Sequence, residues 1–392
     1  MSLARNRPLL IAFRACFWMH FLSAVIVPFY TEWGGLTLAQ MMAMNAWFMA
    51  WNFALEVPTG AVADVFGRKW SMVLGALTAV AGALLYVSTH LLAVFLCAEV
   101  LYAVAYTLVS GAEDALAYDS LVELGRVADA PRMAAQMESG KLFGIIVGAL
   151  LGSAIAARWG LAAPVGAHAV PALCAAVCAA LMQEPTVHQT TGPQEPYMRV
   201  LLAGVRRLRA APVLRLLAFD MVSINAAVWT IIWLYQPLCA AAGLDVVWFG
   251  TLHATMCGAQ ILVLQAAERF EGLVGSARRW LMVSAITSGL GLVGLGLAGS
   301  LPVVITLCMV VMAFGLTRSA PFMAYLNHHI ASAERATVLS TVSMLRTLAI
   351  VVGQLVAGQL THWSLHGTMI ALGIGTIALA WLTRIEDHHL RT

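Results

Sequence analysis

Charged side chains are scarce in this sequence, and that scarcity excludes most classes of soluble protein. Asp, Glu, Lys and Arg make up only 10% of the 392 residues, whereas a soluble domain carries about 25%. The formal net charge is only +3, so no nucleic-acid partner is expected. No nucleophile–base set, metal-ligand cluster or phosphate-binding loop stands out, so we expect no enzyme, no bound metal and no cofactor.

The sequence also offers no disulfide framework. Its seven cysteines all lie in apolar runs, away from the polar loops where an oxidised pair would form. Cys174 and Cys178 share a helix face, but no His or acid accompanies them at ligand spacing. We therefore expect the cysteines to be small apolar core residues.

Apolar residues dominate the chain. They make up 61% of it, and the mean hydropathy is +0.84. A helix that crosses ~30 Å of hydrocarbon needs about 20 residues. Apolar runs of that length predict an all-α membrane protein with twelve transmembrane helices, over 9–30, 38–63, 71–90, 91–118, 138–158, 162–183, 213–241, 247–268, 280–299, 302–325, 337–361 and 365–384.

A polar stretch over 184–211 separates the first six runs from the last six. Its prolines and its basic second half predict a linker that ends in a surface helix. We expect a first six-helix bundle over 1–185, a linker over 186–211 and a second six-helix bundle over 212–392.

The basic residues orient these runs. With the N-terminus inside, every Lys and Arg falls on the inner side except Arg158 outside and Arg14, Arg318 and Arg346 within runs. This asymmetry predicts that both termini and the linker are cytoplasmic. Arg greatly outnumbers Lys in an Ala-rich chain, which favours a GC-rich bacterial genome and hence the bacterial inner membrane.

The two halves repeat each other. Four short matches recur at offsets of 205 to 208 residues and in the same order along both halves. They pair Ile11-Ala12-Phe13-Arg14 with Leu217-Ala218-Phe219-Asp220, Gly35-Leu36 with Gly243-Leu244, Ala117-Tyr118 with Ala324-Tyr325, and Lys141 and Gly148 with Arg346 and Gly353. Parallel repeats of this kind are a transporter architecture, with the substrate path between the halves.

A motif joins the second and third runs on the inner side. Residues 60–69 read Gly-Ala-Val-Ala-Asp-Val-Phe-Gly-Arg-Lys, which resembles the signature Gly-x-x-x-Asp-x-x-Gly-Arg-Lys of the major facilitator superfamily. With the twelve runs and the repeat, the resemblance covers the whole chain. It implies two pseudo-symmetric six-helix bundles and transport by alternating access.

The resemblance assigns a gating role to Gly60, Asp64, Gly67, Arg68 and Lys69. Asp64 lies at the C-terminal end of its helix, where the macrodipole disfavours an anion. We therefore expect it to pair with Arg68 or with the N-terminus of another helix. Gly67 suits a left-handed turn that closes the helix. The alternative is that Arg68 and Lys69 only set the topology.

Eight charges lie within the predicted membrane runs. Each costs about 2.5–3.5 kcal/mol at mid-membrane, so each should face the cavity or a partner. Two interpretations stand side by side: structural ion pairs, or sites of substrate binding and proton transfer. The eight are Arg14, Glu56, Glu99, Glu113, Asp114, Asp220, Arg318 and Arg346.

Arg14 and Asp220 occupy equivalent repeat positions with opposite signs. The resemblance implies that their helices line the cavity, which predicts an ion pair across it. If each charge instead serves its own bundle, Arg14 should pair with Glu113 or Asp114, and Asp220 with Arg318 or Arg346.

Glu99 stands apart, roughly 12 Å from the outer end of its run at ~1.5 Å per residue. Desolvation at that depth favours a neutral acid, which suits a proton carrier. Drug/proton antiporters of the family have a basic residue in this part of the fourth helix, and this departure weakens an antiporter assignment. Gly144, Gly148 and Gly152 resemble the antiporter glycines of the fifth helix, without its usual Pro; close helix packing is the alternative.

Residues near mid-membrane predict an amphipathic cavity wall. Tryptophans in a membrane chain are equally interfacial anchors, and a lone His in a helix is usually structural. The wall candidates are His20, Phe21, Trp47, Trp51, Tyr102, Tyr106, Asn225, Trp229, His253 and Phe314.

These features predict a secondary transporter, with proton-coupled export of a small amphipathic molecule as the leading hypothesis. The alternatives are uptake of a small metabolite or organic anion held by Arg14, Arg318 or Arg346, and a transporter-like receptor or assembly protein. The expected partners are the substrate, protons and the lipid bilayer, and we expect a monomer.

Overall fold

The computed structural model describes residues 3–186, 197–319, 322, 325–326, 329–330, 335–383, 385–387 and 390. Over these residues the regular structure is helical, and no strand occurs among them. The middle of the expected linker, 187–196, and the repeat residue Ala324 lie outside the described residues.

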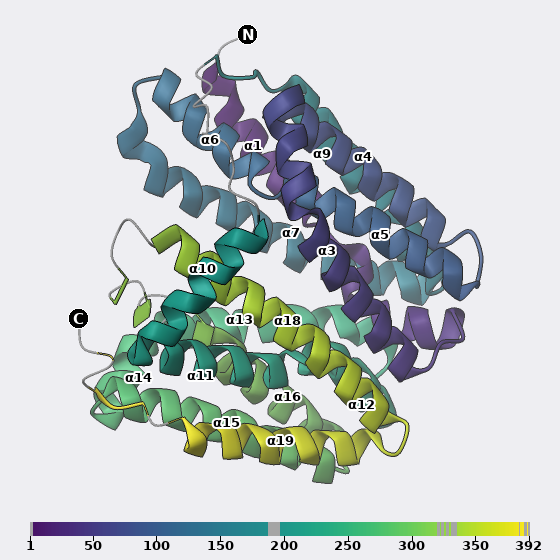
Figure 1. The fold of residues 1–392 in the computed structure, drawn as a ribbon. Helices are drawn as coiled ribbons and strands as arrows, with labels where there is room; N and C mark the ends of the chain where they lie inside the picture. The colour runs from purple at the N-terminus through teal and green to yellow at the C-terminus, as the bar shows by residue number, and fades with distance from the viewer. Residues whose placement is uncertain are drawn as a thin grey trace. The chain divides into compact units, whose positions relative to one another are not determined.

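The helices follow the predicted runs (Figure 1). Those of the first half are α1 (Asn6–Phe17), η2 (Phe21–Ala24), α2 (Ile26–Pro28), η3 (Phe29–Trp33), α3 (Leu38–Phe66), α4 (Arg68–Tyr86), α5 (Leu92–Val109), α6 (Ala112–Glu123), α7 (Ala130–Trp159), α8 (Ala162–Ala167) and α9 (Ala169–Leu181).

The second half begins with the predicted surface helix of the linker, α10 (Tyr197–Ala210). The helices that follow are α11 (Pro212–Trp229), α12 (Ile231–Ala241), α13 (Phe249–Gln265), α14 (Ala267–Val274), α15 (Ala277–Leu297), α16 (Leu301–Gly315), η6 (Leu316–Arg318), α18 (Arg335–Thr361) and α19 (Leu365–Leu382).

The predicted membrane fold is confirmed. Ten helical segments are long and apolar enough to cross a membrane, and the bent pair Leu3–Ala24 and Ile26–Trp33 makes an eleventh. The remaining predicted run is α3, whose 29 residues are long enough for a crossing at ~1.5 Å per residue.

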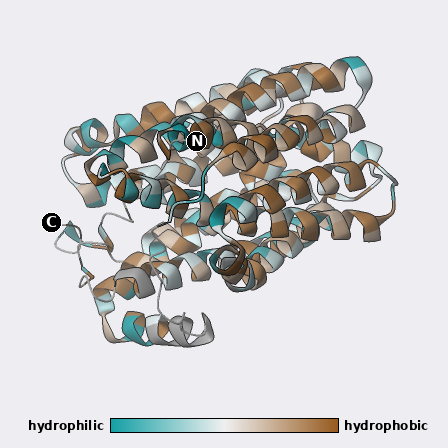
Figure 2. Cartoon of the chain, turned by 90° about the horizontal axis from the view of Figure 1, so that it is seen from above, coloured by the Kyte–Doolittle hydropathy of each residue, from teal (hydrophilic) through white to brown (hydrophobic). Residues whose placement is uncertain are grey.

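The surfaces of the helices are apolar along most of their length. Figure 2 shows hydrophobic residues covering the helices, with hydrophilic residues gathered at loops and helix ends. Large side chains such as Leu262, Leu290 and Leu297 are mostly exposed. Exposed apolar surface on this scale is unfavourable in water and is what lipid contact requires.

The chain forms two compact units. Unit 1 consists of Met1–Thr37, Trp47–Pro193 and Asp245–Ala254, and unit 2 of Leu38–Ala46, Gln194–Leu244 and Thr255–Thr392. The division falls near the expected linker, but each unit also takes a short segment from the other half. Helices α3 and α13 therefore contribute to both units.

The first predicted run is not one continuous helix. Its parts Leu3–Ala24 and Ile26–Trp33 meet at 61°, on either side of Val25. At a second place, between α1 and η2, Trp18, Met19 and His20 are not helical. An interrupted helix inside a bilayer must have its backbone groups satisfied by protein. Here the ring Nδ1 of His168, at the junction of α8 and α9, lies 3.2 Å from the carbonyl oxygen of Met19.

The glycines of α7 pack directly on this interrupted segment. A Cβ on Gly148 would lie 2.8 Å from the backbone nitrogen of His20, and one on Gly144 or Gly152 would overlap the backbone of Ala15 or Phe21. Glycine at every fourth position thus gives α7 a smooth face on which the broken helix rests. In this structure the glycines serve close packing.

We expect Gly152→Ala to disrupt unit 1, because the added methyl group would meet the backbone of Phe21 and the two segments would have to separate. Overpacking of this kind costs about 1–3 kcal/mol or more. The measurement is thermal unfolding of the purified chain in detergent.

Gly258→Ala in α13 is the matched control, because a Cβ there meets nothing within 4 Å and Ala is the better helix former by about 1 kcal/mol. Equal unfolding midpoints for the two variants would contradict the packing role of Gly152.

Candidate functional site

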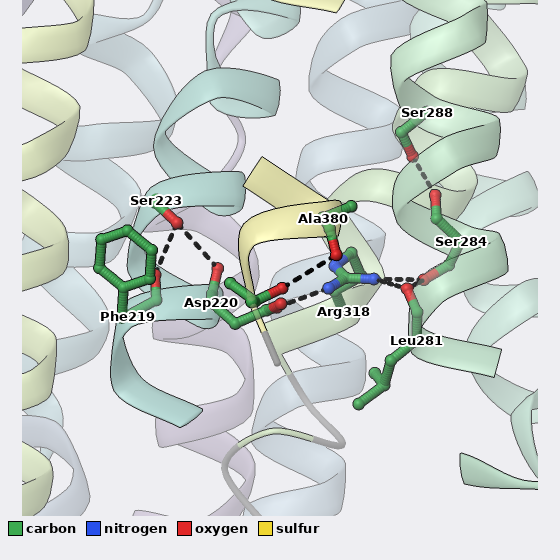
Figure 3. Close-up of polar contacts among 9 residues, drawn as sticks. Phe219, Asp220, Ser223, Leu281, Ser284, Ser288, Arg318 and Ala380 are labelled. Carbon is green, nitrogen blue, oxygen red and sulfur yellow. Dashed lines mark hydrogen bonds and ion pairs between the residues drawn. The ribbon is translucent and has the colours of Figure 1, made fainter. Parts of the chain in front are cut away.

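Unit 2 contains a buried ion pair (Figure 3). The guanidinium Nη2 of Arg318 lies 2.6 Å from Oδ1 of Asp220, and both side chains are 5% exposed. On its other side Arg318 donates to Ser284 Oγ at 2.6 Å and to the carbonyl of Leu281. Two buried charges without these partners would cost several kcal/mol each, so the contacts explain how α11 and η6 tolerate them.

The ion pair borders a cavity of about 260 Å³. Arg278, Trp381 and Glu386 line it together with the pair. The lining residues come mainly from the start of α15 and the end of α19, so the ion pair lies beside a cavity at that end of unit 2.

Unit 1 has an ion pair of its own. Nη2 of Arg14 lies 2.9 Å from Oε1 of Glu113 and 3.6 Å from Oδ1 of Asp114. The two acids occupy the first turn of α6, where the helix macrodipole favours negative charge. The hypothesis of an Arg14–Asp220 pair across the cavity is therefore replaced by its alternative: each charge has a partner inside its own unit.

Glu99 differs from the other intramembrane acids. It is 7% exposed, and no described residue forms an ion pair with it. Instead Tyr30 Oη donates to its Oε1 at 2.9 Å, and the hydroxyls of Tyr30 and Tyr86 lie 2.9 Å apart. Either hydroxyl can be the donor between Tyr30 and Tyr86. The acid thus ends a short chain of hydroxyl groups.

Aromatic and imidazole rings continue from this chain toward the break in the first helix. Tyr102 stacks between Tyr86 and His168, with centroids at 5.6 and 6.1 Å. The rings of His168 and His20 are 5.1 Å apart, and His20 Nε2 lies 2.8 Å from Tyr106 Oη. Sequence candidates His20, Tyr102 and Tyr106 are therefore brought together with Glu99 in unit 1.

The remaining wall candidates fall into separate places. Phe21 is buried against α7, and Trp51 contacts Trp47 edge to face. Phe314 packs against Trp280 and Phe270 in unit 2. His253 lies in the part of α13 that belongs to unit 1.

Several polar side chains in unit 2 have buried atoms without a hydrogen-bond partner among the described residues. On α11, on α12 and at the junction between them they are Asn225 Oδ1, Trp229 Nε1, Thr230 Oγ1 and Trp233 Nε1, and on α18 they are Arg346 Nε and both amide atoms of Gln354. Arg346 also forms no ion pair with any described acid, in contrast to Arg14 and Arg318.

The motif loop is held by residues that the sequence pattern did not identify. The Arg68 guanidinium pairs with Asp119 and donates to the carbonyl of Ala115 at 2.9 Å. Glu184 accepts from the backbone nitrogens of Arg68 and Lys69, at 2.8 Å each, and so caps the start of α4. Gly67 has φ +93°, and a Cβ on it would lie 3.2 Å from the Glu184 carboxylate.

Asp64, expected to pair with Arg68 or a helix N-terminus, is exposed and forms no ion pair or hydrogen bond among the described residues. Arg68 pairs with Asp119 instead, and the N-terminus of α4 is capped by Glu184. Gly60 lies within α3 with open space around it. Glu56, on the same helix, is exposed and also has no ion-pair partner in the described part of the chain.

The functional residues missed by the sequence are Tyr30, Tyr86, Asp119, His168 and Glu184. Each contacts a residue that is far away in the sequence, and no spacing along the chain indicates such a contact.

The family model described as Major Facilitator Superfamily matches residues 9–271. No curated protein sequence matches the chain. Solved structures are similar to it, each at 13% identity. They include a point mutant of the nucleoside transporter NupG, with a TM-score of 0.84 over 97% of this chain and 99% of that one, and a bacterial homologue of the human lysosomal transporter Spinster, with a TM-score of 0.75 over 100% of this chain and 97% of that one. A D-xylose–proton symporter has a TM-score of 0.73 over 98% of this chain and 99% of that one. Identities this low establish likeness of fold.

The two ion pairs predict a pattern of energetic coupling. Arg318→Met should destabilise unit 2 by about 3–5 kcal/mol, because it leaves Asp220 buried and unpaired. The exchange Asp220→Arg with Arg318→Asp should recover part of that loss. Thermal unfolding measures both effects.

Arg14→Ala and Asp220→Ala should instead be additive within about 0.5 kcal/mol, since each removes a different pair. A coupling energy well above that value between Arg14 and Asp220 would restore the pairing across the halves.

The contacts of the motif loop predict that Asp119→Asn lowers stability, whereas Asp64→Asn lowers transport. Asp119→Asn should lower stability by about 3 kcal/mol, because the partly buried Arg68 loses its counter-ion. Asp64→Asn should leave thermal unfolding unchanged, since Asp64 is exposed, and should reduce transport in proteoliposomes. Normal transport by Asp64→Asn at equal protein level would leave the motif as a topology signal only.

Proposed function

This chain belongs to the Major Facilitator Superfamily, and on that premise we propose that it moves a small amphipathic organic molecule across the bilayer in exchange for protons, with Glu99 as the proton site. Family membership makes the protein a transporter rather than an enzyme. The coupling ion, the proton site and the direction are the proposal.

One observation carries the proposal: in the described part of the chain, Glu99 is the intramembrane acid that is buried without a cation. Glu113 and Asp220 are each neutralised by an arginine, whereas Glu99 is hydrogen-bonded to the neutral hydroxyl of Tyr30. A buried carboxylate without a counter-ion is strongly unfavourable. We therefore expect Glu99 to bind a proton when it is enclosed and to release it when water reaches it.

The surroundings of Glu99 support such a cycle. The Tyr30–Tyr86 pair can donate to an ionised Glu99, so the charged form is also accommodated for part of a cycle. Tyr102, His168, His20 and Tyr106 extend from this site to the interruption of the first helix. Interrupted helices in transporters are where substrate and coupling ions bind.

Export is the proposed direction, because Gly144, Gly148 and Gly152 of α7 resemble the glycines of the family's antiporters. Uptake is the second candidate. The D-xylose–proton symporter and the nucleoside transporter of similar fold support transport of small solutes in general. We also propose a bacterial inner-membrane location, cytoplasmic termini and a monomer.

Glu99→Gln should abolish uphill transport and still allow exchange of substrate down its gradient, because the amide keeps the shape and cannot carry a proton. One pH unit is worth about 1.4 kcal/mol, or a tenfold concentration ratio per proton. In proteoliposomes with a gradient of one unit, the wild-type protein should reach about that ratio and Glu99→Gln a ratio near one.

The assay uses a panel of small aromatic amines, amides and acids, with a pH dye inside the vesicles. Glu268→Gln is the matched control, because Glu268 is exposed on α14. Uphill transport by Glu99→Gln with the wild-type pH dependence would assign coupling to another residue.

A further inference from the structure

The cavity beside the Asp220–Arg318 pair has no role in the proposed proton cycle, which takes place in unit 1. Its volume of about 260 Å³ equals the share of about nine water molecules in liquid water. Besides the buried pair, its lining includes the exposed side chains of Arg278, Trp381 and Glu386. A cavity of this size and polarity holds water or a small polar group.

The cavity lies at a membrane surface. Both α15 and α19 are long and apolar enough to cross the membrane, and the lining residues come mainly from the start of α15 and the end of α19. The ends of crossing helices lie where hydrocarbon meets water. Along α15 the lining extends from Arg278 to Ala285, seven residues or about 10 Å along the helix from that boundary.

Two side chains at the end of α19 place the mouth of the cavity beside lipid. Trp381 lines the cavity and is nevertheless 66% exposed, and its neighbour Leu382 is 69% exposed. An exposed Trp at the end of a crossing helix lies at the level of the lipid head groups, and an exposed Leu beside it contacts acyl chains. A lipid at this position has its head group next to the cavity.

The charges around the cavity are of both signs. The inner two are already matched, since Asp220 and Arg318 lie 2.6 Å apart. Arg278 and Glu386 are exposed and form the charged part of the rim. A guest with a single charge would be attracted by one of these two residues and repelled by the other. A guest that carries an anion and a cation a few bonds apart matches both.

We propose that this cavity holds the head group of an ethanolamine phospholipid, with its phosphate at Arg278 and its ammonium at Glu386. Arginine binds phosphate oxygens in a planar, two-pronged geometry. A carboxylate accepts N–H bonds, which an ethanolamine ammonium offers and a choline trimethylammonium does not. The acyl chains continue past Trp381 and Leu382. This site is independent of proton coupling at Glu99 and of the direction of transport.

The test is lipid binding to the full chain in detergent, counted by native mass spectrometry and checked by thermal unfolding. The probes are ethanolamine, choline and glycerol phospholipids with the same acyl chains, and soluble phosphoethanolamine. The ethanolamine lipid should bind at least about tenfold more tightly than the other two lipids. Soluble phosphoethanolamine should bind more weakly than the ethanolamine lipid, because it has no acyl chains to bury.

Two variants separate the roles of the rim charges. Arg278→Gln should weaken binding of the ethanolamine lipid about tenfold or more. Glu386→Gln should remove the preference for the ethanolamine lipid over the glycerol lipid, because the ammonium alone uses that carboxylate. Both positions are exposed, and the backbone nitrogen of Arg278 keeps its bond to Asp387, so both variants should fold.

Arg279→Gln is the matched control, because Arg279 is the next residue of α15, is exposed, and is not among the residues that line the cavity. It should bind the lipids like the wild-type protein. Glu99→Gln should also keep the preference for the ethanolamine lipid, so the proton site and the lipid site are tested separately.

The proposal is overturned if the wild-type protein binds the three lipids equally, if Glu386→Gln keeps the ethanolamine preference, or if Arg279→Gln loses as much binding as Arg278→Gln. Equal binding of soluble phosphoethanolamine and the ethanolamine lipid would overturn the lipid as the occupant and assign the cavity to a soluble phosphate ester. If one rim variant does not fold, the other decides, since each changes a different ratio.

Discussion

Hydrocarbon forms no hydrogen bonds, and this constraint governs every polar group that the chain places in the membrane. Each such group must find its partner within the protein. Arg14 finds Glu113, Arg318 finds Asp220, and the carbonyl of Met19 finds His168. Against this background of matched groups, the buried acid Glu99 without a counter-ion is conspicuous, and it is the group to which we assign proton transfer.

The run lengths, the linker helix and the motif loop were predictable, because each depends on residues close together in the chain. The pairing of charges was not. The repeat places Arg14 and Asp220 at equal depth, but an ion pair requires contact within about 4 Å, and the first turn of α6 brings two acids to Arg14. Equal depth fixes the position of the two residues along the membrane normal, but it does not determine which acid lies beside Arg14.

The proposed proton site also combines a predictable part with an unpredictable one. The depth of Glu99 was readable from its position in an apolar run, whereas its partners Tyr30 and Tyr86 come from two other helices whose sequences are unremarkable. The loop motif likewise contained Gly67 and Arg68, but the anion that caps α4 is Glu184, more than a hundred residues later. Only the folded arrangement joins these parts.

The break in the first helix has a consequence for the order in which the protein is made. The carbonyl of Met19 depends on a histidine 149 residues further along the chain, and the smooth face of α7 on which the break rests is also synthesised later. A newly inserted first segment therefore lacks the contacts to His168 and α7 that stabilise its interruption. We expect it to enter the bilayer as a more regular helix and to acquire the interruption at residues 18–20 only when the later helices of unit 1 assemble around it.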